Sequence, residues 1–378
     1  MANLFELLGL SKAQGSSGKG STDDAKLLVN GKTFEGWTEI KIKKSLKTIS
    51  SSFELTLIDK WAEEQVAWQV APNDECILKI GDETIITGYI DSVNPSFSAS
   101  QRSVTVSGRD KACDLVDCSA VHTNPSWTNI DFERFAKILC DPFSVKVSKQ
   151  SGLSLKTIQA VRINNGDTVF EVLDKQAKML GVLLINDGKG GILITRAGTE
   201  RAATRLVQGV NILSASASFD SKERFSKYIV KSQNGGYDEE VPSVDFSISA
   251  VSTDPNVKRY RPLSIQAEGI ATAALAKLRA SWEATFRAAK SSKISVSVYG
   301  WRQASGMVWE MNKIVGLNSG YLGINQDFLI SGVSFSKGSQ GTTTTLELER
   351  PETYTPDPTI KTKGEAWNQL VQEDRARR

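Results

Sequence analysis

Apolar and polar residues alternate over several short stretches of the chain, and this alternation is typical of β-strands. It runs regularly through residues 85–97, pauses at a Pro/Ser-rich stretch and resumes at Val104 and Val106. Two alternating runs separated by such a stretch predict a hairpin. The pattern stops at the polar sequence SGRD of residues 107–110, so we expect a β-rich unit to end near Asp110.

Residues 327–350 carry the same pattern a second time. Two alternating runs flank a Ser/Gly/Gln loop, and the second run again ends on charged residues. Self-similarity usually indicates repeated architecture, so we expect two related β-domains; the alternative is that the two hairpins share only the pattern common to all hairpins. The alignment matches Val333 and Phe335 to Val93 and Phe97, and Leu346 and Leu348 to Val104 and Val106.

Further alternation surrounds both hairpins. Within residues 26–110 the Asn30-Gly31 pair predicts another tight turn, and several short strands follow at a spacing typical of a barrel or sandwich. Later strands are expected at residues 212–219, 225–231, 246–250 and 294–298.

Apolar residues at helical spacing interrupt the strands in three places. The clearest helix is residues 169–180, because Thr168 and Glu171 form a capping box and Gly181 supplies the C-terminal stop. Helical spacing also marks residues 130–139 and 271–289. The first two helices, with a hairpin behind them, predict a small α+β domain inserted between two β-domains.

The predicted fold class is therefore a mixed, β-rich α+β chain of several domains that contains two related antiparallel β-barrels. Residues 1–25 are expected to hold a short amphipathic helix and a flexible linker. Residues 351–378 contain three prolines close together and are expected to form an extended tail. Between them we predict a first barrel at 26–110, the inserted α+β domain at 111–201, and a second barrel at 202–350 with a helical insertion at about 263–300.

Composition excludes several classes of protein. The 378 residues are 40% hydrophobic and 24% charged, as in ordinary globular proteins, and a net charge of +3 lacks the basic excess of most nucleic-acid-binding proteins. The N-terminus lacks the features of a signal peptide, and no apolar run reaches the roughly 18 residues of a transmembrane helix, so we expect synthesis in the cytoplasm. Cys76, Cys113, Cys118 and Cys140 are expected to be free thiols.

Candidate chemical sites are few. His122 is the only histidine and lies in a turn-like stretch, where a solvated loop histidine is the ordinary outcome. The set formed by His122 with Cys113, Cys118 and Cys140 lacks the paired spacing of zinc ligands. Glu171 and Asp174 lie on the exposed face of a helix and do not stand out as a glycosidase pair. The sequence thus predicts no catalytic residue, no metal and no cofactor.

Lys41, Lys43, Lys44 and Lys47 form a basic run in the first β-domain. Lysine is favoured on exposed edge strands because its charge discourages pairing with another chain. We therefore interpret the run as the guard of an edge strand. The alternative is a surface that faces the phosphates of passing DNA in a weak, sequence-independent contact.

Longer stretches resemble a known family. The segments VTVSGRDKACDLVDCSA, TVFEVLDKQAKMLGVLLI, GGILITRAG and NILSASASFDSKERFSKYIVKSQ are similar, in this order, to baseplate hub (tail) proteins of Mu-like contractile phages. That family is related to phage late control D proteins and to the N-terminal hub fold of type VI secretion spike proteins. The resemblance covers residues 26–354.

The resemblance implies a structural protein of the virion tail baseplate and not an enzyme. It implies a homotrimer whose two barrels per chain form a pseudo-sixfold ring, which joins a hexameric tail tube to a trimeric central spike and forms part of the DNA ejection channel. The implied partners are the spike protein, the tail tube protein, other baseplate proteins and, transiently and without specificity, the passing phage DNA, with no stable membrane insertion. Assembly would take place in the host bacterial cytoplasm.

Three alternatives stay open. A tailocin or a type VI secretion-like injection machine would use an equivalent hub. A tail-associated cell-wall hydrolase is the enzymatic alternative, which a zymogram on the purified protein would reveal. A carbohydrate- or receptor-binding module would use exposed tryptophans as stacking platforms, although buried core tryptophans are commoner. The tryptophans concerned are Trp37, Trp61, Trp68 and Trp301.

The tail carries the candidate partner-binding residues. Tyr354 and Trp367 are large aromatic side chains in a proline-rich segment. We expect this segment to point toward the spike and these two residues to contact it.

Overall fold

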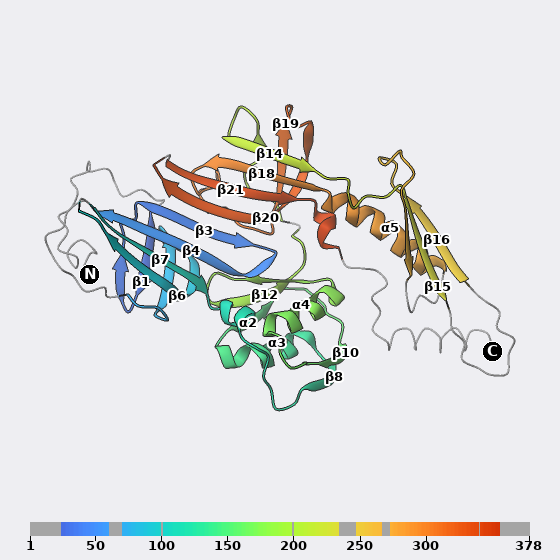
Figure 1. Cartoon of the computed structure of the whole chain (residues 1–378), viewed down its shortest axis with the longest axis horizontal. Coiled ribbons are helices and arrows are strands. Elements are labelled where there is room, and N and C mark those ends of the chain that lie inside the picture. The colour runs from blue at the N-terminus through green and yellow to red at the C-terminus, as the bar shows by residue number, and fades with distance from the viewer. Residues whose placement is uncertain are drawn as a thin grey trace.

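The computed structural model describes residues 24–59, 70–99, 101–198, 200–233, 247–266, 273–339 and 341–355. The helix and linker predicted near the N-terminus, and the tail beyond Thr355 with Trp367, lie outside these ranges. Within them the chain forms one large, mainly antiparallel sheet and two smaller units attached to it (Figure 1).

The large sheet has 13 strands. Those from the first part of the chain are β1 (Ala25–Val29), β2 (Lys32–Phe34), β3 (Glu39–Ser45), β4 (Thr48–Asp59), β5 (Glu75–Ile80), β6 (Glu83–Phe97) and β7 (Arg102–Asp110). Those from the last part are β13 (Leu206–Val207), β14 (Ser214–Phe219), β18 (Ser292–Tyr299), β19 (Ile314–Ser319), β20 (Ile324–Gly338) and β21 (Gly341–Glu349). We call these two sets the first and the second β unit.

The strands follow the order β14-β18-β21-β20-β3-β4-β7-β6-β5-β1-β2, and β19 pairs with β20 and β13. The described strand pairings therefore form one open path, with β14 at one end and β2 at the other. They do not close the two barrels that the sequence predicted. The reason is that β3 and β20 pair with each other, so the hydrogen bonds that would close each unit on itself join the two units instead.

The burial of each strand follows the alternation in the sequence. In β3 the side chains of Ile40 and Ile42 are buried, while those of Lys41 and Lys43 face away from the core. The buried faces of both β units pack into one hydrophobic core. Each fully buried Ile, Val or Leu in it contributes about 1.5–3 kcal/mol relative to exposure.

The two long hairpins, β6–β7 and β20–β21, are equivalent in register. Adding 240 to the residue numbers of the first gives those of the second: Val93 lies opposite Val106, and Val333 lies opposite Leu346. Each hairpin also has a β-bulge at the same position, just after Ile90 and just after Ile330. A bulge is a built-in feature of a strand pair, so its repetition identifies the two β units as structural repeats.

The sequence alignment of the hairpins was right for Val333 but wrong by two residues elsewhere. Phe335 corresponds to Pro95, and Leu346 corresponds to Val106. Alternation has a period of two, so a shift of two residues leaves the apolar pattern unchanged. The alignment from sequence lacked the bulges, which fix the register.

The first smaller unit is the inserted α+β domain, which follows β7 directly. Its elements are α2 (Cys113–Asp117), β8 (Ser126–Ile130), α3 (Phe132–Cys140), η1 (Asp141–Phe143), β9 (Lys146–Lys149), β10 (Ile158–Arg162), α4 (Val169–Leu180), β11 (Leu183–Asn186) and β12 (Gly191–Thr195). The predicted capping box is confirmed, because the Thr168 hydroxyl accepts from the Glu171 N–H and the Glu171 carboxylate accepts from the Thr168 N–H. The unit has its own hydrophobic core.

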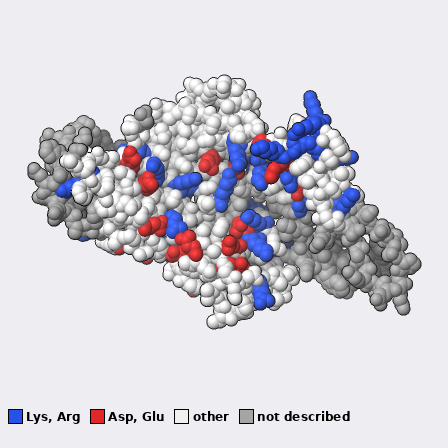
Figure 2. Space-filling view, in the orientation of Figure 1, with Lys and Arg blue, Asp and Glu red and all other residues white. Residues whose placement is uncertain are grey.

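The second smaller unit, which we call the lateral unit, is a three-stranded sheet covered by one helix. Its elements are β15 (Lys227–Gln233), β16 (Ser247–Thr253), β17 (Pro262–Gln266) and α5 (Ala273–Lys290). The strand at residues 225–231, which the sequence predicted for the second barrel, therefore belongs to the lateral unit. Residues 294–298, which were predicted to lie near the end of the helical insertion, belong to β18 of the large sheet. Figure 2 shows basic side chains gathered over this unit.

The last described residues differ from the extended tail that the prolines predicted. Pro351–Tyr354 forms a 3-10 helix, η2, with proline at its start, where its fixed φ and missing N–H are tolerated. No helix in the described part of the chain is long and apolar enough to cross a membrane.

Candidate assembly interface

The junction between the two β units is a strand pair. β3 and β20 pair antiparallel, from Gly332 opposite Ser45 to Lys337 opposite Ile40. On the core side of this pair, Ile42 and Phe335 are both 1% exposed. The two repeats are thus held side by side by backbone hydrogen bonds and by a shared core.

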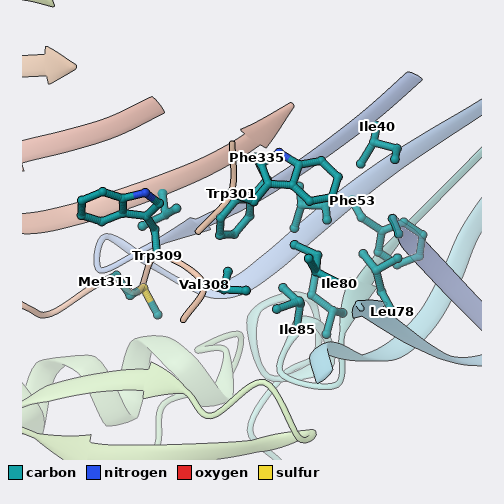
Figure 3. Close-up of a cluster of buried hydrophobic side chains, with 14 of the residues drawn as sticks. Ile40, Phe53, Leu78, Ile80, Ile85, Trp301, Val308, Trp309, Met311 and Phe335 are labelled. Atoms are coloured by element: carbon teal, nitrogen blue, oxygen red, sulfur yellow. The ribbon is translucent and has the colours of Figure 1, made fainter. Parts of the chain in front are cut away.

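Side chains from both repeats meet in that core. Figure 3 shows residues of the first unit packed against residues of the second. The first unit supplies Ile40, Phe53, Leu78, Ile80 and Ile85, and the second supplies Trp301, Val308, Trp309, Met311 and Phe335.

Trp301 is the largest fully buried side chain of this core. Its ring lies 6.1 Å from that of Phe335 in an edge-on arrangement. Its indole N–H donates to the carbonyl oxygens of Ser336 and Thr343, each at 3.1 Å. The indole therefore bridges β20 and β21 beside Phe335, whose partner in β3 is Ile42.

Ion pairs also cross the junction. Lys337 pairs with Asp24 at 2.7 Å, and Lys47 pairs with Glu349. Arg302 pairs with Glu83 and also donates to the Ile80 carbonyl. Apart from the buried Glu349, the members of these pairs are at least partly exposed. Such pairs contribute little free energy individually, about 0–1 kcal/mol, so they fix the orientation of the two units more than they stabilise them.

The face of the sheet opposite the core is lined with hydroxyl groups. They pair across neighbouring strands in both repeats, at distances of 2.7–3.0 Å. The pairs are Ser92 with Ser107, Ser96 with Ser103, Thr56 with Thr105, and Ser297 with Thr345. The same face also carries charged side chains in ion pairs, Lys41 with Glu54 and Arg109 with Asp91.

A buried carboxylate anchors the inserted domain to the first β unit. The Asp110 carboxylate accepts from the Ser51 N–H at 2.6 Å and from the Ala112 N–H at 3.1 Å. Burial raises the pKa of Asp110 to about 6, although both hydrogen bonds act in the opposite direction. Asn186 of the inserted domain donates to the Ser51 hydroxyl and the Ile49 carbonyl, at 2.6 and 3.2 Å.

Three family models match the chain and together span most of it. Residues 24–110 match the N-terminal domain of the Mu phage baseplate assembly protein GpP-like family. Residues 112–196 match the second domain of the gp44-like baseplate hub family, and residues 272–357 match the fourth domain of the Mu phage baseplate assembly protein GpP.

The baseplate hub protein gp44 of Escherichia phage Mu is 32% identical over 323 residues, which cover 83% of this chain and 84% of that protein. The chain belongs to the Mu-type baseplate hub family. It is therefore a structural component of the phage tail baseplate and so of the virion, in a family of hub proteins and not of enzymes. As such it assembles with other baseplate proteins.

Solved structures agree with this assignment. The 43 kDa tail protein of prophage MuSo2 from Shewanella oneidensis superposes on the hub chain with a TM-score of 0.79 at 33% identity, covering 88% of this chain and all (100%) of that one. A tail protein of Neisseria meningitidis matches at 0.70 and 22% identity, covering 89% and 98%. A component of the E. coli type VI secretion system shares the fold, with a TM-score of 0.55 at 10% identity over 89% and 80% of the two chains.

The lysine run of the hub chain does not guard an edge, and that interpretation was wrong. β3 pairs with β4 on one side and with β20 on the other. Lys41 pairs instead with Glu54 at 2.8 Å. Lys44 lines a cavity of about 300 Å³ between the sheet and the inserted domain, where burial lowers its pKa. Sequence showed the lysines but not the partner strand, because that strand lies far along the chain.

Three of the four cysteines are buried, and the histidine is exposed. Burial raises the pKa of Cys76, Cys113 and Cys140 to about 12, so these thiols stay protonated and are poor metal ligands. His122 lies in an exposed loop, and its ring is tilted against that of Trp127, with ring centroids 5.0 Å apart. Among the described residues no group of three or more His, Cys, Asp or Glu is arranged to hold a metal ion.

The two helix carboxylates have local structural partners. Glu171 completes the capping box, and Asp174 pairs with Lys178 one turn later. Neither lines the cavity between the sheet and the inserted domain.

The aromatic candidates have different environments. Trp37 and Trp301 are 5% and 0% exposed, so they belong to the core and offer no stacking platform; Trp61 and Trp68 lie outside the described residues. Tyr354 is half-buried, and its hydroxyl donates to the Glu349 carboxylate at 2.8 Å.

Sequence reasoning missed the two features that dominate the interface. The hydroxyl pairs of the outer face consist of Ser and Thr, which in the sequence are only the polar half of each alternation. The junction itself, β3 with β20, joins segments from the first and the last part of the chain, and no local pattern indicates that pairing. The constant offset of 240 residues between the hairpins was a signal for the repeats alone.

Proposed function

We propose that the hub chain assembles as a homotrimer whose six β units form a pseudo-sixfold ring between a hexameric tail tube and a trimeric central spike. The observation that supports this is the equivalence of the two β units, joined side by side through β3 and β20. Three such chains would present six like units to a hexameric partner and three identical chains to a trimeric one.

We further propose that the ring belongs to the DNA ejection channel. A face of hydroxyl groups can contact phosphates without the many Lys and Arg neutralisations that make DNA binding strong. Contact with the passing phage DNA would then be transient and independent of sequence. Assembly with the tail tube, the spike and other baseplate proteins would take place in the host bacterial cytoplasm.

The experiment that tests the ring is a measurement of solution mass by light scattering. We expect the purified chain to have three times its mass of 41.2 kDa. If the chain is monomeric alone, the measurement is repeated with the cognate spike protein, which is expected to drive the trimer. A hub that stays monomeric in both samples contradicts the ring.

We propose that the spike is contacted by the segment beyond Thr355, with Trp367 as its main aromatic residue. Deleting residues 356–378 should abolish binding to the spike without changing the oligomer. The deletion retains Tyr354, whose hydroxyl has a partner within the chain, and the Thr355 carbonyl, which accepts from the Trp282 indole at 3.1 Å.

A single substitution sharpens that test. Trp367→Ala should weaken spike binding by roughly 30-fold, the effect of losing about 2 kcal/mol at an interfacial tryptophan. Tyr354→Phe is the control variant. It removes only the hydroxyl bonded to Glu349 and keeps the aromatic ring, so it should leave spike binding unchanged. Unchanged spike binding after deletion of the segment would contradict the proposal.

A further inference from the structure

The equivalence of the two repeats extends beyond the long hairpins. Asn73 and Asn312 both adopt left-handed backbone conformations, with φ of 74° and 63°. Asn73 donates its N–H to the Ile90 carbonyl, and Asn312 donates to the Ile330 carbonyl, both at 2.8 Å. In both repeats the segment just before the preceding strand, β5 or β19, is thus hydrogen-bonded to the long strand, β6 or β20, in the same way.

The outer strands also correspond. β3 pairs with β4 in the first repeat, with Ile42 opposite Phe53. β14 pairs with β18 in the second repeat, with Ala217 opposite Ile294. Phe53 lies opposite Gly108 and Ile294 opposite Leu348, which are again related by the offset of 240. β14 is therefore the counterpart of β3, and Ala217 occupies the position of Ile42.

One pairing of the first repeat has no counterpart within the chain. β3 pairs with residues 332–337 of β20. The counterparts of these strands are β14 and residues 92–97 of β6. Among the described residues, β14 pairs only with β18, and residues 92–97 of β6 pair only with β7. Both counterparts therefore have one unpaired edge.

β14 is also an unprotected edge. Its sequence, SASASF, contains no charge and no proline, the usual devices that keep an exposed edge from pairing with another chain. Phe219 at its end is 66% exposed, and Phe97 at the end of β6 is 87% exposed. An uncharged edge with exposed aromatic residues is expected to be covered by a partner strand.

We propose that β14 of one copy pairs antiparallel with residues 92–97 of β6 in the next copy, in the register that β3 and β20 use within one chain. The proposal rests on the trimeric ring proposed above and names the surface that closes it. The expected opposite pairs are Phe97 with Ala215, Ser96 with Ser216, Pro95 with Ala217, Asn94 with Ser218, and Val93 with Phe219.

This contact is head-to-tail, because each copy offers a different edge at each side. Such a contact makes either a closed ring or an open filament, depending on the rotation between copies. Pro95 takes the place of Phe335 and has no N–H, so the ladder between copies has fewer donors than the ladder within a chain. The contact between copies is accordingly expected to be weaker than the junction between repeats.

Paired cysteines test the register. Ser96→Cys and Ser216→Cys together place thiols on directly opposite residues, whose Cα atoms lie about 4.5–5.5 Å apart in an antiparallel pair, within the range of roughly 4.4–6.8 Å that a disulfide spans. Both side chains are exposed, so the substitutions leave the core intact. Exposed Cys118 is first replaced by Ser to remove background cross-linking. We expect mild oxidation to give covalent dimers and trimers on a non-reducing gel.

Two matched variants control the experiment. Lys41→Cys with Ser336→Cys occupies the same pair position within one chain and should form a disulfide in the monomer band. Ser96→Cys with Ser214→Cys keeps both thiols on the same face but moves one by two residues, and should cross-link at least ten-fold less. Equal cross-linking of the two intermolecular pairs would overturn the proposed register.

The mass measurement separates the two proposals. A trimer that forms the Lys41–Ser336 cross-link but not the Ser96–Ser216 cross-link would overturn the edge pairing and leave the trimeric ring standing. A monomer with no intermolecular cross-link, alone and with the spike protein, would overturn both. A cross-linked ladder that continues beyond the trimer would retain the edge pairing and overturn the closed ring.

Discussion

Replacing Gly88 with alanine is expected to destabilise the hub chain by about 3 kcal/mol or more, the upper part of the range for overpacking a close-packed site. Gly88 lies in β6, between β5 and β7. A Cβ added there would lie 1.9 Å from the Arg109 carbonyl oxygen and 2.5 Å from the Asp110 Cα. Because both atoms belong to the backbone of β7, relief of the clash requires the strand itself to move.

The matched control is Gly338→Ala, at the end of the equivalent strand β20. A Cβ at Gly338 would meet no atom within 4 Å. The control therefore has the same change of side chain and the same loss of unfolded-state entropy as Gly88→Ala, but no clash in the folded state. Chemical denaturation of both variants measures the difference, and a Gly88→Ala variant within about 0.5 kcal/mol of the control would show that β7 can shift freely.

Replacing Trp301 with alanine is expected to cost about 3–5 kcal/mol, the usual loss for a fully buried tryptophan. The substitution empties the core where β20 meets β3 and removes a donor to two carbonyl groups. Because this part of the core joins the two repeats, we expect the loss of stability to be accompanied by loss of the proposed trimer. Thermal unfolding and light scattering on the same samples measure both effects.

Two phenylalanine variants separate the hydrogen bonds of Trp301 from its packing. Trp301→Phe should cost about 1–3 kcal/mol, because the carbonyl groups of Ser336 and Thr343 lose a donor. Trp309 is 3% exposed and its indole N–H has no partner among the residues that the structure describes, so Trp309→Phe should be less costly by at least about 1 kcal/mol. Equal losses for the two variants would show that packing alone accounts for the effect of Trp301.

The sequence predicted the parts of the fold that depend on local patterns. Alternation located the strands of both long hairpins, and the capping box at Thr168 located α4 correctly. The family resemblance predicted a baseplate hub, and the relatives confirm this. These features are encoded within a few residues or over long segments of similar sequence, so they can be read without knowing what lies next to them in space.

The parts that could not be predicted depend on contacts between distant segments. The partner of β3 is β20, and nothing near residues 39–45 indicates it. The lysines of β3 were assigned to an edge for that reason. The assignment of residues 225–231 to the second barrel failed in the same way, because alternation shows that a strand exists but not which sheet it joins.

The pairing of β3 with β20 also has a consequence for synthesis of the chain. Lys47, next to β3, and its partner Glu349 are 302 residues apart. At a bacterial rate of about 5–20 residues per second, roughly 15–60 s separate their emergence from the ribosome. During that time β3 has no β20 beside it, and we expect its lysines to discourage pairing with a neighbouring nascent chain. A lysine run that guards no edge in the finished hub is thus expected to guard one while the hub is being made.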